Sequence, residues 1–306
     1  MTVQLKAYAK INLFLDVTGR RADGYHDIKS LMQTVSLYDL VTVSTDEDAP
    51  FVITISCDNE NVPCNEKNLA YRAADRFYEA FGKRSATHIK IEKNIPMEAG
   101  LAGGSTDAAA VLIALNRIFG EPFSKERLCE VGKKLGADVP FCILGGSAEV
   151  SGIGDVLSPI SDLRSLFFVV AKHGAGVSTP AAYGLLDEIF GGFAGEYAGG
   201  TAEKGCYETL LSELREGSTA PVRSVYNIFE KAILPRHKDA LELKELLLSS
   251  GAEIAMMSGS GPSVFGVFRD MRSAECAAAR LNEGREIPIA FAVHSVVGGT
   301  GRISEK

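Results

Sequence analysis

The feature that most restricts the fold is a strict alternation of apolar residues near the N-terminus. In the segment LKAYAKINLFLDV, every odd-numbered residue from 5 to 17 is apolar. A period of two residues predicts a long β-strand with one buried face. Lys10 and Asn12 then project together from the opposite, unburied face of that strand.

Length and charge narrow the class of protein. A chain of 306 residues is long for one core, so we expect two domains, 1–157 and 158–306, joined near the segment LSPISDLRS. The composition, 46% hydrophobic and 23% charged, is typical of a soluble globular protein. A net charge of −7 argues against a nucleic-acid partner, although one pocket can still bind a small anion.

Apolar runs and cysteine spacing indicate a cytoplasmic protein outside the membrane. The longest apolar run, Ala108 to Leu115, is far shorter than the ~20 residues that span a bilayer. Six cysteines are scattered without a C-x-x-C pair, which favours reduced thiols. The five histidines form no H-E-x-x-H motif, so we expect no structural metal.

Periodicity predicts mixed helices and strands without regular βαβ alternation, which indicates two α+β domains. Besides the first strand, the first half is expected to hold strands at 35–44, 51–56 and 88–92 and helices at 69–81, 108–119 and 124–135. The second half is expected to hold strands at 166–171, on both sides of residues 258–263 and at 290–297, and helices at 180–189, 224–234 and 240–248. The stretch 191–205, with six glycines, is predicted to be a surface loop.

A glycine-rich loop, PMEAGLAGGST (96–106), leads directly into the second predicted helix. It lacks the lysine of the familiar phosphate loop G-x-x-x-x-G-K-[ST]. Backbone N–H groups at a helix N-terminus can still bind an anion without a charged side chain. The hydroxyls of Ser105 and Thr106 could reach a magnesium ion. The alternative is an ordinary glycine-rich turn between a strand and a helix.

Three further segments carry polar residues in turns. In GADVPF (136–141), Asp138 lies near a helix start, where it could cap the helix or act as a catalytic base. In DGYHDI (23–28), a tyrosine and a histidine mark either a surface turn or a binding site. The segment SGSGPS (258–263) predicts a hairpin turn and lacks the Rossmann fingerprint.

Taken in order, AKINLFLDV, GYH, PMEAGLAGGSTDAA, GADVPF and SGSGPSVFG resemble the GHMP kinases, which include galactokinase, homoserine kinase and mevalonate kinase. The resemblance covers almost the whole chain. It implies an α+β fold with an N-terminal ribosomal-protein-S5-domain-2-like domain and a C-terminal ferredoxin-like α/β-sandwich domain. ATP and Mg²⁺ would be used in the cleft between them.

Within this superfamily, AKINLFLDVTGRRADGYHDI and MQTV are similar to the kinases of the non-mevalonate isoprenoid precursor pathway. These enzymes use ATP to phosphorylate the 2-hydroxyl of 4-diphosphocytidyl-2-C-methyl-D-erythritol. The resemblance implies small-molecule partners and a monomer or weak homodimer. Two alternatives stay open: another GHMP kinase, of the homoserine or mevalonate type, and a nucleotide-binding protein without catalysis.

The resemblance also assigns roles to single residues. Lys10 and Asp138 match the catalytic pair, so Lys10 would supply the positive charge that the loop lacks. The substrate side is matched by Asn12, Tyr25, His26 and Tyr183. The ATP-binding residues are Lys93, Pro96, Met97, Glu98, Ala99, Gly100, Leu101, Ala102, Gly103, Gly104, Ser105 and Thr106. Glu98 and Ala102 depart from the smaller or glycine residues usual in this loop. The helix glutamate that holds magnesium elsewhere in the superfamily has no identified counterpart.

Overall fold

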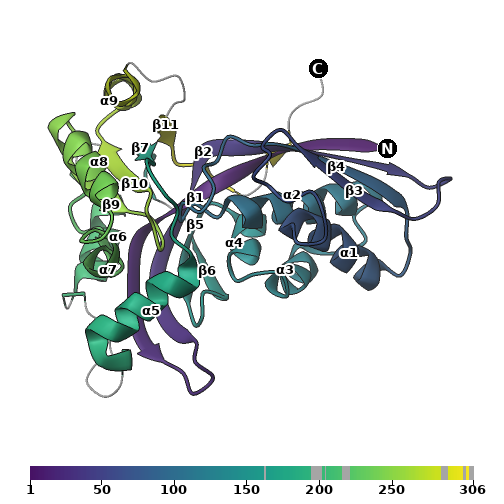
Figure 1. The fold of residues 1–306 in the computed structure, drawn as a ribbon, viewed down its shortest axis with the longest axis horizontal. Coiled ribbons are helices and arrows are strands. Elements are labelled where there is room, and N and C mark those ends of the chain that lie inside the picture. The colour runs from purple at the N-terminus through teal and green to yellow at the C-terminus, as the bar shows by residue number, and fades with distance from the viewer. Residues whose placement is uncertain are drawn as a thin grey trace.

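The structure is a computed structural model that describes residues 1–161, 163–193, 202–203, 205–215, 221–283, 289–298 and 301–302. Two β-sheets, each covered by helices, lie next to one another in Figure 1. The larger sheet contains β1 (Thr2–Arg20), β2 (His26–Asp46), β3 (Ile53–Cys57), β4 (Ala86–Glu92), β5 (Ser147–Ser151), β6 (Val156–Ile160), β8 (Tyr226–Asn227) and β12 (Gly301–Arg302).

Strand β1 confirms the predicted alternation but not the predicted exposure of its second face. The odd-numbered residues from Leu5 to Val17 are all buried. Lys10 and Asn12 are also buried, with exposed fractions of 4% and 1%, so the expectation of an unburied face is wrong. The reason is that other residues pack against this second face: a Cβ added to Gly259 of the second half would lie 3.3 Å from Lys10 Nζ, and the Asn12 amide donates to Ser30 Oγ at 2.8 Å. The glycine-rich loop also contacts β1, where the Lys10 N–H donates to the Leu101 carbonyl at 3.2 Å.

Four helices cover one face of the larger sheet (Figure 1). They are α1 (Leu69–Phe81), α2 (Gly103–Ile118), α3 (Lys125–Lys133) and α4 (Asp138–Leu144). Helix α1 confirms its prediction, because the Asn68 side chain caps its start and Gly82, with a φ of 77°, ends it in the left-handed region. Helix α2 begins at Gly103, five residues before the predicted range 108–119, so its first turn is formed by the end of the glycine-rich loop.

The second half builds the smaller sheet. Its elements are β7 (Phe167–Ala171), α5 (Thr179–Phe190), a 3₁₀ turn (Gly191–Phe193), α6 (Cys206–Arg215), α7 (Glu230–Ile233), α8 (Lys238–Ser249), β9 (Ile254–Met257), β10 (Val264–Phe268), α9 (Met271–Asn282) and β11 (Ala290–His294). The strand order β11-β7-β10-β9, antiparallel throughout, is that of a ferredoxin-like βαββαβ unit. Helices α8 and α9 lie on its outer side in Figure 1.

Two regions after residue 155 differ from expectation, and the predicted surface loop is largely outside the described residues. The helix predicted over 224–234 is the short strand β8 followed by α7, because residues 226–227 pair in parallel with β1. Residues 156–160, expected as a crossing between domains, form β6 against β5, so the division at 157/158 falls inside a strand and stays a prediction. Most of the glycine-rich stretch 191–205, namely 194–201 and 204, lies outside the described residues.

The two halves meet backbone to backbone at Gly100 and the turn 258–263. The Ser258 hydroxyl donates to the Gly100 carbonyl at 3.1 Å. A Cβ added to Gly100, whose φ is 70°, would lie 2.1 Å from the Ser258 carbonyl oxygen. Glycine is therefore required here both for the left-handed conformation and for the close approach.

We predict that Gly100→Ala destabilises the protein more than Gly82→Ala. Both glycines have positive φ, which costs an alanine roughly 1–2 kcal/mol. A Cβ at Gly82 meets nothing within 4 Å, so only the Gly100 variant also disrupts the contact between the halves. Denaturant titration of the two variants measures the difference in the free energy of unfolding. Equal losses would show that the loop moves away from the turn at no cost.

Candidate active site

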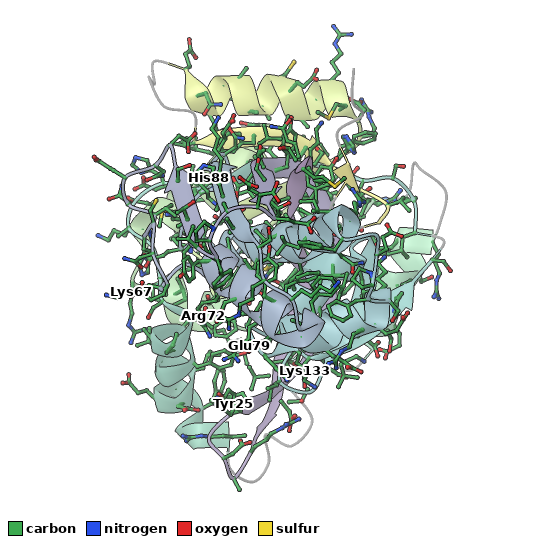
Figure 2. The ribbon with its side chains drawn as sticks, turned by 90° about the vertical axis from the view of Figure 1, so that its right-hand side faces the viewer. Tyr25, Lys67, Arg72, Glu79, His88 and Lys133 are labelled. Carbon is green, nitrogen blue, oxygen red and sulfur yellow. The ribbon has the colours of Figure 1, made fainter. Side chains whose placement is uncertain are left out.

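A cavity of about 880 Å³ lies between the two halves. The predicted site residues that line it are Lys10, Asn12, Tyr25, His26, Lys93, Asp138, Tyr183 and the loop from Pro96 to Ser105. Thr106 is the one predicted residue that is not part of the lining. Figure 2 shows Tyr25 low in the view, near the hairpin that joins β1 to β2. The structure thus brings together residues from segments far apart in the chain.

The glycine-rich loop presents backbone N–H groups at the start of α2. Glu98, Gly100 and Ala102 all have positive φ, and these left-handed turns fold the loop back onto the helix start. The first turn of α2 carries no acidic side chain that would repel an anion. The Thr106 hydroxyl donates to the Tyr8 carbonyl at 2.7 Å and is buried, whereas Ser105 is partly exposed to the cavity. Of the two hydroxyls, only that of Ser105 is placed to contact a bound ligand.

Lys10 supplies a positive charge that no carboxylate neutralises. Its ammonium donates to the neutral Oδ1 of Asn12 at 2.6 Å, and the Asn12 amide donates in turn to Ser30 Oγ at 2.8 Å. Among the described residues, Lys10 forms no ion pair, and this includes Asp138, its predicted catalytic partner. A buried ammonium with a neutral partner is a strong site for anionic oxygen.

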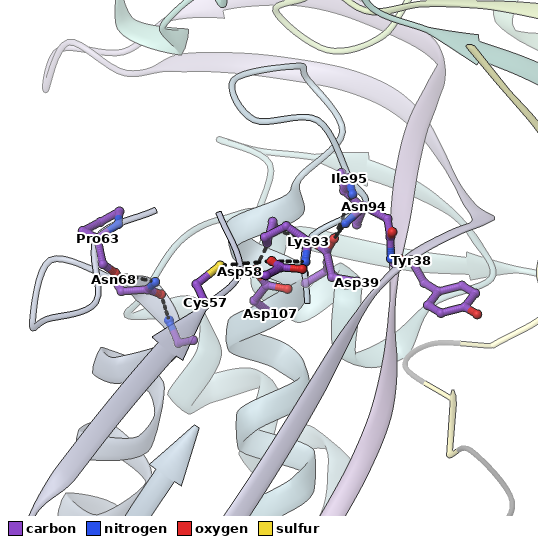
Figure 3. Close-up of polar contacts among 12 residues, drawn as sticks. Tyr38, Asp39, Cys57, Asp58, Pro63, Asn68, Lys93, Asn94, Ile95 and Asp107 are labelled. Atoms are coloured by element: carbon purple, nitrogen blue, oxygen red, sulfur yellow. Dashed lines mark hydrogen bonds and ion pairs between the residues drawn. The ribbon is translucent and has the colours of Figure 1, made fainter. Parts of the chain in front are cut away.

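Lys93, in contrast, is held between two carboxylates (Figure 3). Its ammonium donates to Asp39 Oδ2 and, at 2.8 Å, to Asp107 Oδ2. Burial lowers the pKa of Lys93, but the two carboxylates outweigh burial and raise the pKa overall. The other oxygen of Asp39 accepts from the backbone N–H groups of Asn94 and Ile95, which fixes the chain just before the loop. Lys93 therefore positions the loop and carries no spare charge.

Of the two carboxylates that bind Lys93, that of Asp107 has fewer hydrogen-bond partners than that of Asp39 among the described residues. In the part of the chain that the structure describes, its Oδ1 has no hydrogen-bond partner, although the side chain is buried and lines the cavity. Burial raises the pKa of this carboxyl to about 7. Neither Asp39 nor Asp107 was predicted as a site residue. The position of Asp107 directly after the sequence GGST was the available signal.

Asp138 begins α4 but does not cap it. The residue at the N-cap position is Ala137, which has no side-chain cap bond. Within the described part of the chain, the Asp138 carboxylate accepts no hydrogen bond, so it is available to a ligand. Burial, and after it the charge of Asp138, raises the pKa of Tyr183. Asp138 lines the same cavity as Lys10 and Tyr183.

The aromatic wall of the cavity is formed by Tyr183 and His26. Their rings stack with centroids 4.7 Å apart and planes inclined by 21°. Phe229 supports Tyr183 edge-on at 5.0 Å. His26 Nε2 lies 2.7 Å from Asp187 Oδ1, a partner that the sequence did not reveal. Tyr25 is 60% exposed at the rim, so its ring is available to a ligand.

The Glu98 side chain contacts the second half of the chain. A Cβ added to Gly176 would lie 2.5 Å from Glu98 Oε2, so this side chain packs on the backbone after β7. Lys172, the first residue after β7, donates to the Met97 carbonyl at 2.6 Å. The second half of the chain thus contacts Met97 and Glu98, which come shortly before the first glycine of the loop.

Two negative findings hold for the described residues. There, no three histidine, cysteine or acidic side chains gather in a way that could hold a metal ion. No helix in that part of the chain combines the length and apolar character needed to cross a bilayer.

Comparison with known proteins identifies the family. The GHMP kinases N terminal domain matches residues 68–146 and the GHMP kinases C terminal domain matches residues 203–286. The 4-diphosphocytidyl-2-C-methyl-D-erythritol kinase of Caldicellulosiruptor bescii is 40% identical over 280 residues, which cover 91% of this chain and 94% of the relative.

Solved structures agree with this assignment. A crystal structure of 4-(cytidine 5'-diphospho)-2C-methyl-D-erythritol kinase superimposes with a TM-score of 0.78 at 32% identity, covering 97% of this chain and 99% of the other. A homoserine kinase from Cytophaga hutchinsonii, at 20% identity and a TM-score of 0.69 over 99% of this chain and 97% of its own, shares the fold. This chain belongs to the GHMP kinases and, within them, to the 4-diphosphocytidyl-2-C-methyl-D-erythritol kinase family.

Proposed function

We propose that this chain transfers the γ-phosphoryl group of ATP to the 2-hydroxyl of 4-diphosphocytidyl-2-C-methyl-D-erythritol, giving the 2-phosphate and ADP. The observation that carries the proposal is the content of one cavity. Helix-terminus amides, the uncompensated ammonium of Lys10 and the free carboxylate of Asp138 share it with the stacked pair Tyr183 and His26. The amides, Lys10 and Asp138 suit phosphoryl transfer, and the stacked rings suit the binding of a cytosine ring.

Each group has a defined part in the transfer. The amides at the start of α2 bind the phosphates, and Lys10 stabilises negative charge on the transferred group. The acceptor oxygen forms a bond to the γ-phosphorus while the bond from that phosphorus to the bridging oxygen of ADP breaks. Asp138 accepts the proton of the hydroxyl and later releases it to solvent. Phosphoryl transfer needs little more than this positioning and charge stabilisation.

Magnesium fits the cavity through Ser105 and the phosphates of the nucleotide. The Ser105 hydroxyl faces the cavity at the start of α2, and hydroxyl, phosphate and water oxygens are the ligands that Mg²⁺ prefers. When bound, magnesium would neutralise part of the triphosphate charge.

We also propose that the protein works in the cytoplasm, as a monomer or weak homodimer. All six cysteines carry free thiols, which is typical of a reducing compartment. Lys10, Asp138, Tyr183 and the glycine-rich loop of one chain line one cavity, which supports a monomer that is active by itself.

One assay separates this proposal from its alternatives. Purified protein is supplied with ATP and, in turn, with the cytidyl substrate, uncytidylated methylerythritol phosphate, homoserine or mevalonate, and ADP release is measured. We expect rapid release only with the cytidyl substrate. Preference for homoserine or mevalonate would identify another GHMP specificity, and ATP binding without release would identify a non-catalytic protein.

We predict that Asp138→Asn lowers kcat by about 10²- to 10⁴-fold, the usual contribution of a general base. The amide is nearly isosteric, and Asp138 makes no cap bond, so the melting temperature and the ATP affinity should stay close to those of the parent. Near-normal turnover would show that the carboxylate is not the base.

The two lysines should respond differently to substitution by methionine. Lys10→Met removes a charge whose only described partner is a neutral amide, so we expect a large loss of kcat with a small loss of stability. Lys93→Met leaves two buried carboxylates without their cation, and removing one partner of a buried pair costs about 3–5 kcal/mol. Thermal unfolding and steady-state kinetics distinguish the two effects. Unfolding of the Lys10 variant would make Lys10 structural.

We predict that Tyr183→Ala raises the KM for the cytidyl substrate and leaves the KM for ATP nearly unchanged. Stacking of a base on an aromatic ring contributes ~1–3 kcal/mol, equivalent to roughly a 5- to 150-fold change. Tyr183→Phe keeps the ring against His26 and Phe229 and is the matched control, expected to behave like the parent. A rise in the KM for ATP instead would move the aromatic wall to the nucleotide side.

A further inference from the structure

The turn 258–263 is the part of the second half that reaches the reacting groups. A Cβ added to Gly259 would lie 2.9 Å from the Gly100 carbonyl oxygen and 3.3 Å from Lys10 Nζ. Ser258 Oγ accepts from the backbone N–H of Asn12 at 3.4 Å and donates to the Gly100 carbonyl. The turn is thus in contact with both the phosphate-binding loop and the strand that carries Lys10.

The side chain of Asn227 fixes this turn from behind. It is 3% exposed, and its amide nitrogen donates to the carbonyls of Met257 at 2.7 Å and Gly259 at 2.9 Å. Its oxygen accepts from the N–H of Phe229 at 2.9 Å. One buried amide therefore holds the last residue of β9 and the second residue of the turn.

Glu230, three residues later, fixes the same strand end. Its Oε1 accepts from the Met257 N–H at 2.9 Å, and its Oε2 pairs with Lys244 of α8 at 2.6 Å. The N–H and the C=O of Met257 are thus both bound by side chains from residues 227–230. We call Asn227 and Glu230 the turn clamp.

The turn clamp is attached to the strand that carries Lys10. Asn227 pairs with Leu15 of β1, and the Ile228 N–H donates to the Leu15 carbonyl at 3.0 Å. These contacts form a closed ring. Strand β1 pairs with β8, Asn227 of β8 binds the turn 258–263, and the turn contacts Gly100 of the glycine-rich loop and Lys10 of β1. The ring therefore fixes the distance between Lys10 and the glycine-rich loop, which is the proposed phosphate-binding loop.

We propose that Asn227 and Glu230 are positioning residues for the phosphoryl transfer. They hold the turn 258–263 where it keeps the phosphate-binding loop and Lys10 directed at the same phosphoryl group. Neither side chain lines the cavity, so they act through the turn and not on the substrates. The inference rests on the proposed function, because it concerns the geometry of that reaction.

Loss of the turn clamp should lower kcat more than it weakens binding. None of the described hydrogen bonds of the turn clamp is made by the amides at the start of α2 or by the side chains of Tyr183 and His26, so we expect ATP and the acceptor still to bind. The reacting groups lose their alignment, and a misplacement of about 1 Å can reduce a rate by ~100-fold. For Asn227→Ala we therefore expect a fall in kcat of about 10- to 100-fold with little change in either KM.

Asn282→Ala is the matched control for Asn227→Ala. The Asn282 side chain also makes three hydrogen bonds to backbone, with the Ile289 N–H and with the N–H and C=O of Ala290, but it lies away from the cavity. We expect both variants to lower the melting temperature and only Asn227→Ala to lower kcat. Equal kcat values in the two variants would reduce Asn227 to a structural residue.

Glu230 offers a graded test. Glu230→Gln retains an oxygen that accepts from the Met257 N–H and should keep most of the parent kcat, whereas Glu230→Ala should not. Lys244→Met removes the ion pair but spares the bond to Met257, and it should leave kcat unchanged. A loss of kcat in Lys244→Met equal to that in Glu230→Ala would show that the ion pair, and not the clamp, matters.

Two provisions keep the test decisive. If Asn227→Ala does not fold, Ser258→Ala opens the ring at its other end, and the same selective fall in kcat is expected. A parent-like kcat in that variant would overturn the proposal. If the parent protein itself phosphorylates no cytidyl substrate, the proposed function has failed. If the parent is active but the clamp variants match Asn282→Ala, only the positioning role has failed.

Discussion

The structure depends on one strand that both halves share. Along β1, Leu5 and Ala7 pack into the core beneath α1 and α2. The residues that follow pack into two cores that include the smaller sheet: Ala9, Ile11, Leu13 and Phe14 into one, Leu15 and Val17 into the other. A strand that contributes to three hydrophobic clusters fixes their relative positions, because it cannot shift in register without exposing one of them. The cavity exists where these clusters meet, and Lys10 and Asn12 enter it from the same strand.

The side chains that bind each lysine decide where positive charge is available in the cavity. Lys93 and Lys10 are both buried and both line the cavity. Two carboxylates neutralise Lys93, whereas the described partner of Lys10 is a neutral amide. Of these two lysines, Lys10 therefore carries the charge that is available to an anion, and β1 brings it to the glycine-rich loop, which has no lysine of its own.

Much of the fold could be predicted from the sequence, and each wrong prediction has an identifiable physical cause. Alternation and helical spacing predicted β1 and α1, because local periodicity is enough to define which face is buried. Alternation says nothing of what covers the second face, so the burial of Lys10 and Asn12 was missed. Residues 224–234 have helix-like apolar spacing, but pairing with β1 draws the first part into a strand.

The side chains that organise the site were harder to predict. Asp39 meets a lysine 54 positions away, and Asn227 holds a turn 30 to 32 positions away. Such partners carry no local pattern, since each is an isolated polar residue beside apolar neighbours. The five motifs did predict the cavity lining, because glycines and paired polar residues in turns mark backbone that approaches a ligand.

The pairing of β8 and β12 onto β1 has a consequence for how substrates are admitted. Residues 226–227 and 301–302, from the second half of the chain, add to the edge of β1 that β2 leaves open, so hinge opening would break main-chain hydrogen bonds at two places along that edge. Rigid-body closure around the ligands is therefore costly, and the cavity is largely preformed. Water must then be displaced by the acceptor itself, so the fit of the alcohol protects ATP from hydrolysis.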